Sequence, residues 1–314
     1  MKFCILEPLG MTACKYGQLK KEFEELGHEL VFFGDRREDE RELIKRAEGA
    51  DAIVVSNIPI TKNFIEACPQ LTMISVAFTG VDHIDMQACN DRGVLVSNAA
   101  GFSTESVAEL TIGMILSLYR KIGAGDFITR FGGDRGGFLG TELNGKTIGV
   151  IGAGAIGLRV AEMAKIFNCK VIAYSRSEKS LDGIKFVDKL SLLQEADIVT
   201  LHVPLTSETK GLIGEKELKL MKSSAILINT ARGPIVDSKA FCNALENSEI
   251  AGAALDVYEK EPPLEKDHIL FSAPNLVLLP HIAYATNESF EKRVDIVMEN
   301  IKLWLKGKPR NIMN

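Results

Sequence analysis

The sequence lacks the features that mark several classes of protein. Its six cysteines have no close pairs along the chain, so their spacing suggests neither a zinc site nor a disulfide framework, and no metal is expected. It has no excess of positive charge, and the net charge of −5 argues against a nucleic-acid or membrane-surface partner. No apolar run reaches spanning length, and the short one before Glu7 and Pro8 suits a first strand better than a secretory signal. A cytoplasmic protein with no membrane partner is expected.

The overall composition is that of an ordinary globular protein. Hydrophobic residues make up 46% and charged residues 25%, which is enough to bury a sizeable core. The length of 314 residues predicts roughly two domains.

A glycine-rich run in the middle of the chain is the most informative motif. Residues 147–157 read TIGVIGAGAIG, a buried strand that turns through Gly152, Gly154 and Gly157 into a helix. The first glycine permits the tight turn, the second lets the backbone approach a pyrophosphate, and the third lets helix and strand pack closely. This pattern predicts a dinucleotide-binding turn, and its central position predicts that another domain is built from the flanks.

Coarse periodicity predicts two sets of strands with helical patterns between them. The first set lies at residues 2–6, 29–33, 51–56, 73–77 and 94–97. The second set lies at residues 147–151, 170–174, 198–202, 225–229, 252–256 and 277–279. Strands that alternate with helices imply parallel sheets, so the sequence predicts an α/β fold. A last helix at 288–306 is expected to return to the first domain.

The stretch 104–119 is almost continuously apolar and too short to cross a bilayer. It must therefore be buried against protein. Two interpretations stay open: an ordinary core helix, or a helix shared between the domains and a second subunit.

The residues after the second strand of the nucleotide unit bear on cofactor choice. An acidic residue roughly 20 positions after the glycines usually binds the ribose 2′-hydroxyl of NAD. Here the strand ends at Ser175 and Arg176, where serine can hydrogen-bond to a 2′-phosphate and arginine can pair with it. NADP is therefore the favoured cofactor. The alternative is that Arg176 is a solvated loop charge and that NAD binds without its usual acid.

Three residues in the last third of the chain form a candidate catalytic set. Arg232, Glu261 and His281 each follow a predicted strand, at the carboxyl edge where open parallel sheets bind ligands. Reduction of a ketone by hydride needs a proton donor, which His281 can supply, and a neighbouring Glu261 would favour the protonated imidazole. Arg232 could bind a carboxylate and polarise the adjacent carbonyl. Each residue alone also has a structural explanation, as a helix cap, a surface acid or a core histidine.

Several further motifs follow in order along the chain. They are Asn98-Ala99-Ala100, Ser106-Val107-Ala108-Glu109, His202-Val203-Pro204-Leu205-Thr206, Asn229-Thr230-Ala231-Arg232-Gly233, Asp256-Val257 with Glu261-Pro262, and Pro280-His281-Ile282-Ala283. Together with the glycine run they resemble the D-isomer-specific 2-hydroxyacid dehydrogenase family over essentially the full length. The resemblance implies a Rossmann domain, a doubly wound parallel sheet at residues 99–285, that binds NAD(P). It implies that this domain is inserted into a smaller flavodoxin-like α/β substrate domain, residues 1–98 and 286–314. It also implies a homodimer closed through the helix near 104–119.

The resemblance assigns roles to the motif residues. It makes His281 the general acid/base, Glu261 its partner, and Arg232 the ligand of the substrate carboxylate and carbonyl. Asp256 matches the position that binds the nicotinamide carboxamide, and the loop with Phe78, Thr79 and Gly80 matches the segment whose amides hold the substrate carboxylate. The full set of expected cofactor residues is Gly152, Gly154, Ala155, Ile156, Gly157, Ser175, Arg176, Thr230, Ala231 and Asp256. Two departures from the family pattern are Ser175 in place of the acid and the absence of a tryptophan ahead of the glycine run, where Phe138 lies nearby.

The expected function is therefore an NAD(P)-dependent oxidoreductase acting on the CH–OH group of donors. It would reduce a small 2-oxo acid, such as hydroxypyruvate or glyoxylate, to the D-2-hydroxy acid. One alternative is a 3-phosphoglycerate dehydrogenase without a regulatory domain, because the chain stops at Asn314. Another is a non-catalytic NAD-sensing binding protein similar to the co-repressors built on this scaffold.

Overall fold

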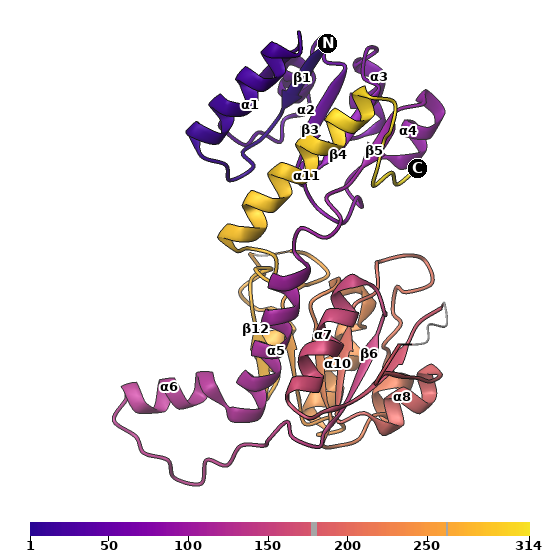
Figure 1. Cartoon of the computed structure of the whole chain (residues 1–314). Helices are drawn as coiled ribbons and strands as arrows, with labels where there is room; N and C mark the ends of the chain where they lie inside the picture. Colours follow the sequence, from indigo (N-terminus) through magenta and orange to yellow (C-terminus); the bar gives the residue numbers. More distant parts are fainter. Residues whose placement is uncertain (177–180, 262) are drawn as a thin grey trace. The chain divides into compact units, whose positions relative to one another are not determined.

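The computed structural model describes residues 1–176, 181–261 and 263–314 (Figure 1). The chain divides into two compact units. The first unit combines Met1–Ser103 with Ala285–Asn314, and the second is the continuous segment Thr104–Tyr284.

The first unit is built on a five-stranded parallel sheet with the order β2-β1-β3-β4-β5. The strands are β1 (Lys2–Ile5), β2 (Glu29–Phe32), β3 (Ala52–Val55), β4 (Met73–Val76) and β5 (Leu95–Ser97). The central strands β3 and β4 read AIVV and MISV and are buried throughout, as expected for parallel strands covered on both faces.

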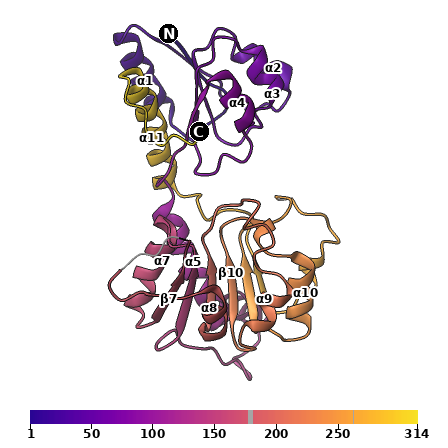
Figure 2. The same ribbon diagram turned by 90° about the vertical axis from the view of Figure 1, so that its right-hand side faces the viewer.

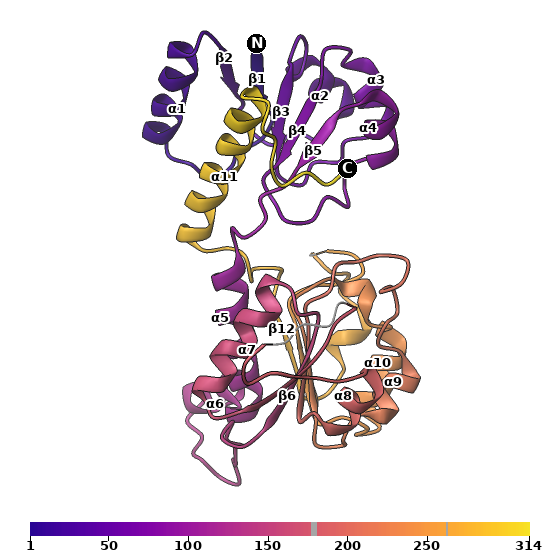
Figure 3. The same cartoon turned by 45° about the vertical axis from the view of Figure 1, so that its right-hand side comes forward.

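Helices cover both faces of this sheet (Figure 3). They are α1 (Ala13–Glu25), α2 (Glu40–Arg46), α3 (Lys62–Ala67), α4 (Met86–Arg92) and α11 (Asn287–Leu305). Helices α2, α3 and α4 pack on one face through a core that includes Leu43, Phe64 and Cys89. Helix α11 lies on the other face, where the Ser75 hydroxyl donates to the carbonyl of Val297. The carboxy-terminal segment is thus part of the first unit.

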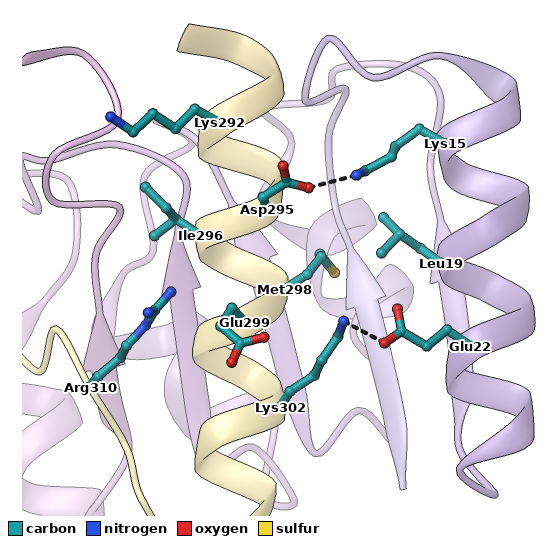
Figure 4. A pocket seen from close by; sticks show the side chains of 10 residues that line it. All are labelled: Lys15, Leu19, Glu22, Lys292, Asp295, Ile296, Met298, Glu299, Lys302 and Arg310. Atoms are coloured by element: carbon teal, nitrogen blue, oxygen red, sulfur yellow. Dashed lines mark hydrogen bonds and ion pairs between the residues drawn. The ribbon is translucent and has the colours of Figure 1, made fainter. Parts of the chain in front are cut away.

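A surface cavity of about 380 Å³ lies between α1 and α11. Figure 4 shows the side chains that line it. Two ion pairs cross it, Lys15 with Asp295 at 2.6 Å and Lys302 with Glu22 at 2.5 Å. These pairs join the two helices, and the cavity is a groove between their side chains.

The second unit contains a seven-stranded parallel sheet with the order β12-β11-β10-β9-β6-β7-β8. The strands are β6 (Thr147–Ile151), β7 (Lys170–Tyr174), β8 (Lys185–Phe186), β9 (Ile198–Leu201), β10 (Ile226–Asn229), β11 (Gly252–Leu255) and β12 (Leu276–Leu278). The chain starts in the middle at β6, runs outward to β8, and then crosses back to β9. The strand order therefore reverses between β6 and β9, which is the position where open α/β sheets bind ligands.

Helices also lie on both faces of the second sheet (Figure 2). They are α5 (Thr104–Arg120), α6 (Ile122–Arg130), α7 (Ala155–Ile166), α8 (Lys189–Glu195), α9 (Glu215–Leu220) and α10 (Ser238–Glu246), with short turns η1 (Gly233–Ile235) and η2 (Ile269–Phe271). Helices α5 and α7 pack on the face that carries Ile148 and Val150. The other face meets α8, α9 and α10 through side chains such as Leu192, Leu218 and Phe241.

The predicted α/β architecture with parallel sheets is confirmed, and the strand bounds agree to within one or two residues. The main element that the periodicity did not predict is α6. Among the helices of the described ranges, none combines the length and the apolar character needed to cross a membrane.

Candidate active site

The carboxyl ends of five parallel strands bring most of the predicted residues to one edge of the second sheet. Gly152 follows β6, Ser175 follows β7, Thr230 follows β10, Asp256 follows β11 and His281 follows β12. Because the strands are parallel, these ends lie on the same edge.

The glycine turn between β6 and α7 has three glycines with different surroundings. Gly152 has a φ of +102°, and a Cβ atom there would lie 2.4 Å from the carbonyl oxygen of His202. A Cβ atom on Gly157 would lie 2.0 Å from the carbonyl oxygen of Gly152. Gly154, the residue that precedes α7, has no heavy atom within 4 Å of its hypothetical Cβ. The turn thus needs Gly152 and Gly157 for its own packing and leaves open space at Gly154.

This geometry fits a dinucleotide. The open position lies at the amino end of the 12-residue helix α7, where unpaired N–H groups and the helix dipole favour an anion. Ala155 and Ile156 form the first turn of this helix. The residues present therefore match what a pyrophosphate group requires.

Ser175 and Arg176 lie just beyond β7, next along the same edge. The Arg176 side chain is exposed, and its guanidinium forms an ion pair with Glu208 at 3.1 Å. Glu208 lies in the loop after β9, and the sequence analysis did not identify it as a site residue. Its carboxylate would compete with a cofactor 2′-phosphate for Arg176.

His281 and Glu261 form a hydrogen-bonded pair. The imidazole Nδ1 lies 2.8 Å from Glu261 Oε2, and both side chains keep partial access to solvent. His281 has a φ of +57°, which is the left-handed region that residues other than glycine seldom adopt. The ring of Tyr284 meets the imidazole edge-on, with the centroids 5.5 Å apart.

Asp256 holds the loop that carries His281. Its carboxylate is fully buried, and its two oxygens accept hydrogen bonds from the N–H groups of Ile282 and Ala283, each at 2.8 Å. Burial raises the pKa of Asp256, and the two amide hydrogen bonds oppose this shift. The structure thus shows a backbone-binding role that the sequence did not reveal, and the nicotinamide contact of Asp256 stays a prediction.

Tyr258 joins neighbouring strand ends and was also missed by the sequence. Its hydroxyl donates to the carbonyl of Leu279 at 2.7 Å, two residues before His281. A Cβ atom on Gly233 would lie 1.9 Å from the Tyr258 backbone, so the turn after Arg232 packs directly against this segment. The exits of β10, β11 and β12 are therefore tied to one another.

Arg232 lies in the turn after β10 and is half-buried. Its guanidinium donates to the carbonyl of Ala231 at 2.8 Å, and its own carbonyl accepts from the side chain of Asn229 at 2.9 Å. The hydroxyls of Thr230 and Thr111 lie 3.2 Å apart, which fixes the same turn to α5. The turn that carries the predicted carboxylate ligand is thus held on both sides.

The predicted substrate loop belongs to the first unit, after β4. The carbonyl of Phe78 accepts from the N–H of Ala99 at 2.9 Å, and the carbonyl of Thr79 accepts from the Asn98 side chain at 2.7 Å. Within the part of the chain that the structure describes, no hydrogen bond uses the N–H groups of Thr79 and Gly80. The loop is therefore anchored through its carbonyls and leaves these two amides available.

His202 has no catalytic geometry. Its Nε2 lies 2.8 Å from the Thr200 hydroxyl, and burial lowers the pKa of His202 to about 3. Across residues 1–176, 181–261 and 263–314, no group of three or more His, Cys, Asp and Glu side chains could hold a metal ion.

Comparison with known proteins gives a consistent family. The model described as "D-isomer specific 2-hydroxyacid dehydrogenase, NAD binding domain" matches residues 112–283. The glyoxylate reductase of Thermococcus litoralis is 41% identical over 286 residues, covering 87% of this chain and 86% of that protein. The D-3-phosphoglycerate dehydrogenase of Methanocaldococcus jannaschii is 39% identical over 322 residues, covering 100% of this chain but 59% of that protein.

A solved structure shares the fold of the whole chain. An acyclic imino acid reductase in complex with NADPH and D-arginine has a TM-score of 0.91 and is 34% identical, with 100% of both chains covered. The resemblance inferred from the motifs is confirmed. This chain belongs to the D-isomer specific 2-hydroxyacid dehydrogenase family and is an oxidoreductase that uses a nicotinamide cofactor and acts on CH–OH donors.

Proposed function

We propose that this protein reduces a small 2-oxo acid, hydroxypyruvate or glyoxylate, to the D-2-hydroxy acid with NADPH. The observation that carries the proposal is the pair of His281 and Glu261 at 2.8 Å, at the sheet edge that also carries the glycine turn. The name of the Thermococcus litoralis relative, glyoxylate reductase, supports this substrate class.

The proposed mechanism gives each residue one task. The nicotinamide, when bound, supplies the hydride. His281 delivers a proton to the carbonyl oxygen as negative charge develops there, and the Glu261 carboxylate holds Nδ1 and stabilises the imidazolium. Arg232 binds the substrate carboxylate and polarises the carbonyl. The amides of Thr79 and Gly80 are the proposed ligands that the first unit offers to a substrate carboxylate.

In this proposal the two units have different tasks. Residues 99–285 bind the cofactor, with Asp256 near the nicotinamide carboxamide, Thr230 and Ala231 along the dinucleotide, and Ala155 and Ile156 at the pyrophosphate. Residues 1–98 and 286–314 bind the substrate.

The preference for NADPH rests on Ser175 and Arg176, which replace the acid that would repel a 2′-phosphate. The imino acid reductase of the same fold was solved with NADPH, which is consistent with this choice. The variant Ser175→Asp with Arg176→Ala is expected to shift preference towards NADH.

A homodimer is part of the proposal. Helix α6 has no buried residue in the single chain, and Ile122, Phe127 and Phe131 are exposed apolar side chains on and beside it. A cavity of about 840 Å³ lies beside this helix, lined by the end of α5, Phe138, Leu139 and the start of β12. A second copy of the chain would cover these surfaces.

A 3-phosphoglycerate dehydrogenase activity is the second candidate, because the Methanocaldococcus jannaschii relative matches the whole of this chain. The test is an initial-rate panel of glyoxylate, hydroxypyruvate, pyruvate, phenylpyruvate and 3-phosphohydroxypyruvate, each with NADPH and NADH. Turnover of hydroxypyruvate or glyoxylate with NADPH is the expected result. Fastest turnover of 3-phosphohydroxypyruvate would favour the second candidate, and silence with cofactor still bound would favour an NAD-sensing binding protein.

A further inference from the structure

A polar network that the proposed mechanism does not use lies at the carboxyl edge of the first sheet. Glu7 follows β1, Arg36 follows β2 and Asn57 follows β3. In the strand order β2-β1-β3-β4 the three exits follow one another, and the exit of β3, which carries Asn57, lies next to β4. Strand β4 leads into the loop with Thr79 and Gly80. The network is therefore a neighbour of the proposed carboxylate-binding amides.

Glu7 fixes the turn after β3. Its side chain is only 3% exposed, and Oε1 accepts from the N–H groups of Ser56, Asn57 and Ile58 at 2.7, 3.2 and 3.3 Å. The other oxygen, Oε2, accepts from Arg36 at 2.6 Å. Because this buried carboxylate accepts from four donors, three of them amides of the turn, it restrains the turn more strongly than solvent would.

Arg36 fixes the orientation of the Asn57 side chain. The guanidinium donates to Asn57 Oδ1 at 2.5 Å and cannot accept a hydrogen bond, so the amide must turn its oxygen towards the arginine. The amide nitrogen Nδ2 then points away from Arg36 with two N–H donors. Asn57 is exposed, and no hydrogen bond from Nδ2 is found among the described residues.

The register places Asn57 opposite the substrate loop. Val55 pairs with Val76 in the parallel ladder, so Asn57 and Phe78 each lie two residues beyond paired positions. Neighbouring strands are about 4.8 Å apart, so a small 2-oxo acid held at Thr79 and Gly80 could extend towards Asn57.

We propose that Asn57 Nδ2 donates a hydrogen bond to the C3 oxygen of the substrate, which makes a 3-hydroxy-2-oxo acid the preferred substrate. This inference rests on the proposed function and narrows its substrate class to that of hydroxypyruvate. Asn57 is the specificity-determining residue, and Glu7 and Arg36 are positioning residues.

The charges of the network favour a neutral hydroxyl over a phosphate. Arg36 pairs with two carboxylates, Glu7 at 2.6 Å and Glu38 at 2.9 Å, so its positive charge is already compensated. Arg36 would therefore offer a dianionic substituent at C3 little uncompensated positive charge.

The test compares three substrates in each enzyme variant. Hydroxypyruvate carries the C3 hydroxyl, pyruvate has a methyl group there, and glyoxylate has no C3. In Asn57→Ala the ratio of kcat/KM for hydroxypyruvate to that for pyruvate should fall about 5- to 10-fold, the effect of one lost hydrogen bond. The rate with glyoxylate should stay within about twofold of the wild type, because glyoxylate cannot reach Asn57. Asn63→Ala, which removes an exposed asparagine of the same unit that binds Glu40, should leave the ratio unchanged.

The outcomes separate this inference from the proposed function. An unchanged ratio in Asn57→Ala, or equal losses with all three substrates, would overturn the role of Asn57 while the reduction of 2-oxo acids stands. A wild-type preference for pyruvate or for 3-phosphohydroxypyruvate over hydroxypyruvate would overturn the substrate class. Absence of turnover with every 2-oxo acid would overturn the proposed function and this inference with it.

Discussion

At the residue scale, the candidate chemistry depends on side chains whose backbone is held in an uncommon conformation. The left-handed backbone of His281 costs on the order of 1 kcal/mol or more, so the surrounding contacts must stabilise it. Asp256 supplies two of these contacts to the amides that follow His281, and the Tyr258 hydroxyl binds the carbonyl of Leu279 on the other side. The imidazole is thereby presented to Glu261 in one orientation.

Removing the charge of Glu261 tests the catalytic pair. Glu261→Gln keeps an oxygen that can accept from Nδ1 but cannot stabilise the imidazolium, so kcat for reduction should fall at least about 10-fold. His281→Ala should lower kcat by about 10²- to 10⁴-fold with little change in cofactor affinity, measured by fluorescence titration. Glu265→Gln is the matched control, because Glu265 is an exposed acid nearby that pairs with Lys260. Wild-type turnover in His281→Ala would refute the assignment.

His202 predicts how stability depends on pH. Its pKa is about 3 in the folded protein and about 6.5 when unfolded, so below pH 6.5 the unfolded state binds more protons. Stability should therefore fall as the pH falls from about 6.5 towards 3, and the contribution at pH 5 is up to about 2 kcal/mol. Urea unfolding at pH 7.5 and pH 5 should show a smaller difference in His202→Asn than in the wild type. An identical difference in both proteins would assign the pH dependence to other groups.

At the element scale, the glycines of the strand–turn–helix unit of β6 and α7 have two different roles, one in packing and one in cofactor binding. Gly152 and Gly157 lie against backbone carbonyls, whereas Gly154 lies against open space. The three glycines of the motif are therefore not equivalent, although they look alike in the sequence.

Two alanine variants test this difference. Gly157→Ala would place a methyl group 2.0 Å from the Gly152 carbonyl oxygen, so the turn must shift, and we expect a loss of stability of several kcal/mol. Gly154→Ala meets no protein atom and has an ordinary φ of −80°, so its melting temperature should stay close to that of the wild type. The KM for the cofactor should nevertheless rise at least about 10-fold in Gly154→Ala, because the methyl group occupies the space of the pyrophosphate. Unchanged cofactor affinity in that variant would show that the dinucleotide does not approach Gly154.

The same scale shows what the sequence could predict. Strands such as β3 and β4 are short runs of buried residues between turns, and parallel order follows from their alternation with helices. The positions of Arg232, Glu261 and His281 after strands predicted their common edge. Helix α6 was missed because it contains two glycines, Gly123 and Gly125, and no residue of it is buried in its own chain. Periodicity reports burial within one chain, so it carries little signal there.

Contacts between residues far apart along the chain could not be predicted from the sequence either. The bonds of Glu7 to the amides of Ser56, Asn57 and Ile58 span 49 to 51 positions, and nothing local marks Glu7 as their acceptor. The pair of Arg176 and Glu208 spans 32 positions. Such partners follow from strand order and loop conformation, which the sequence pattern does not specify in atomic detail.

At the scale of the whole molecule, each unit has its own parallel sheet and its own core. The first unit is assembled from both ends of the chain: Asn300 donates to the carbonyl of Asn98, and the N–H of Met313 donates to the carbonyl of Val96. The second unit is continuous in sequence, so its fold depends on one uninterrupted segment.

Helix α6 is the proposed contact between two copies of the chain. Phe127 and Phe131 are 62% and 76% exposed, and their ring centroids lie 4.5 Å apart. The two rings together form an exposed apolar surface. We expect light scattering to give a mass of about twice 34.4 kDa for the wild type. The double variant Phe127→Glu with Phe131→Glu should give the mass of one chain and keep the wild-type far-UV circular dichroism, because neither ring is buried within the chain. Phe271→Glu, which changes an exposed phenylalanine in η2, should leave the dimer intact. A dimeric double variant would show that α6 is not the contact between copies, and a monomeric wild type would refute the homodimer itself.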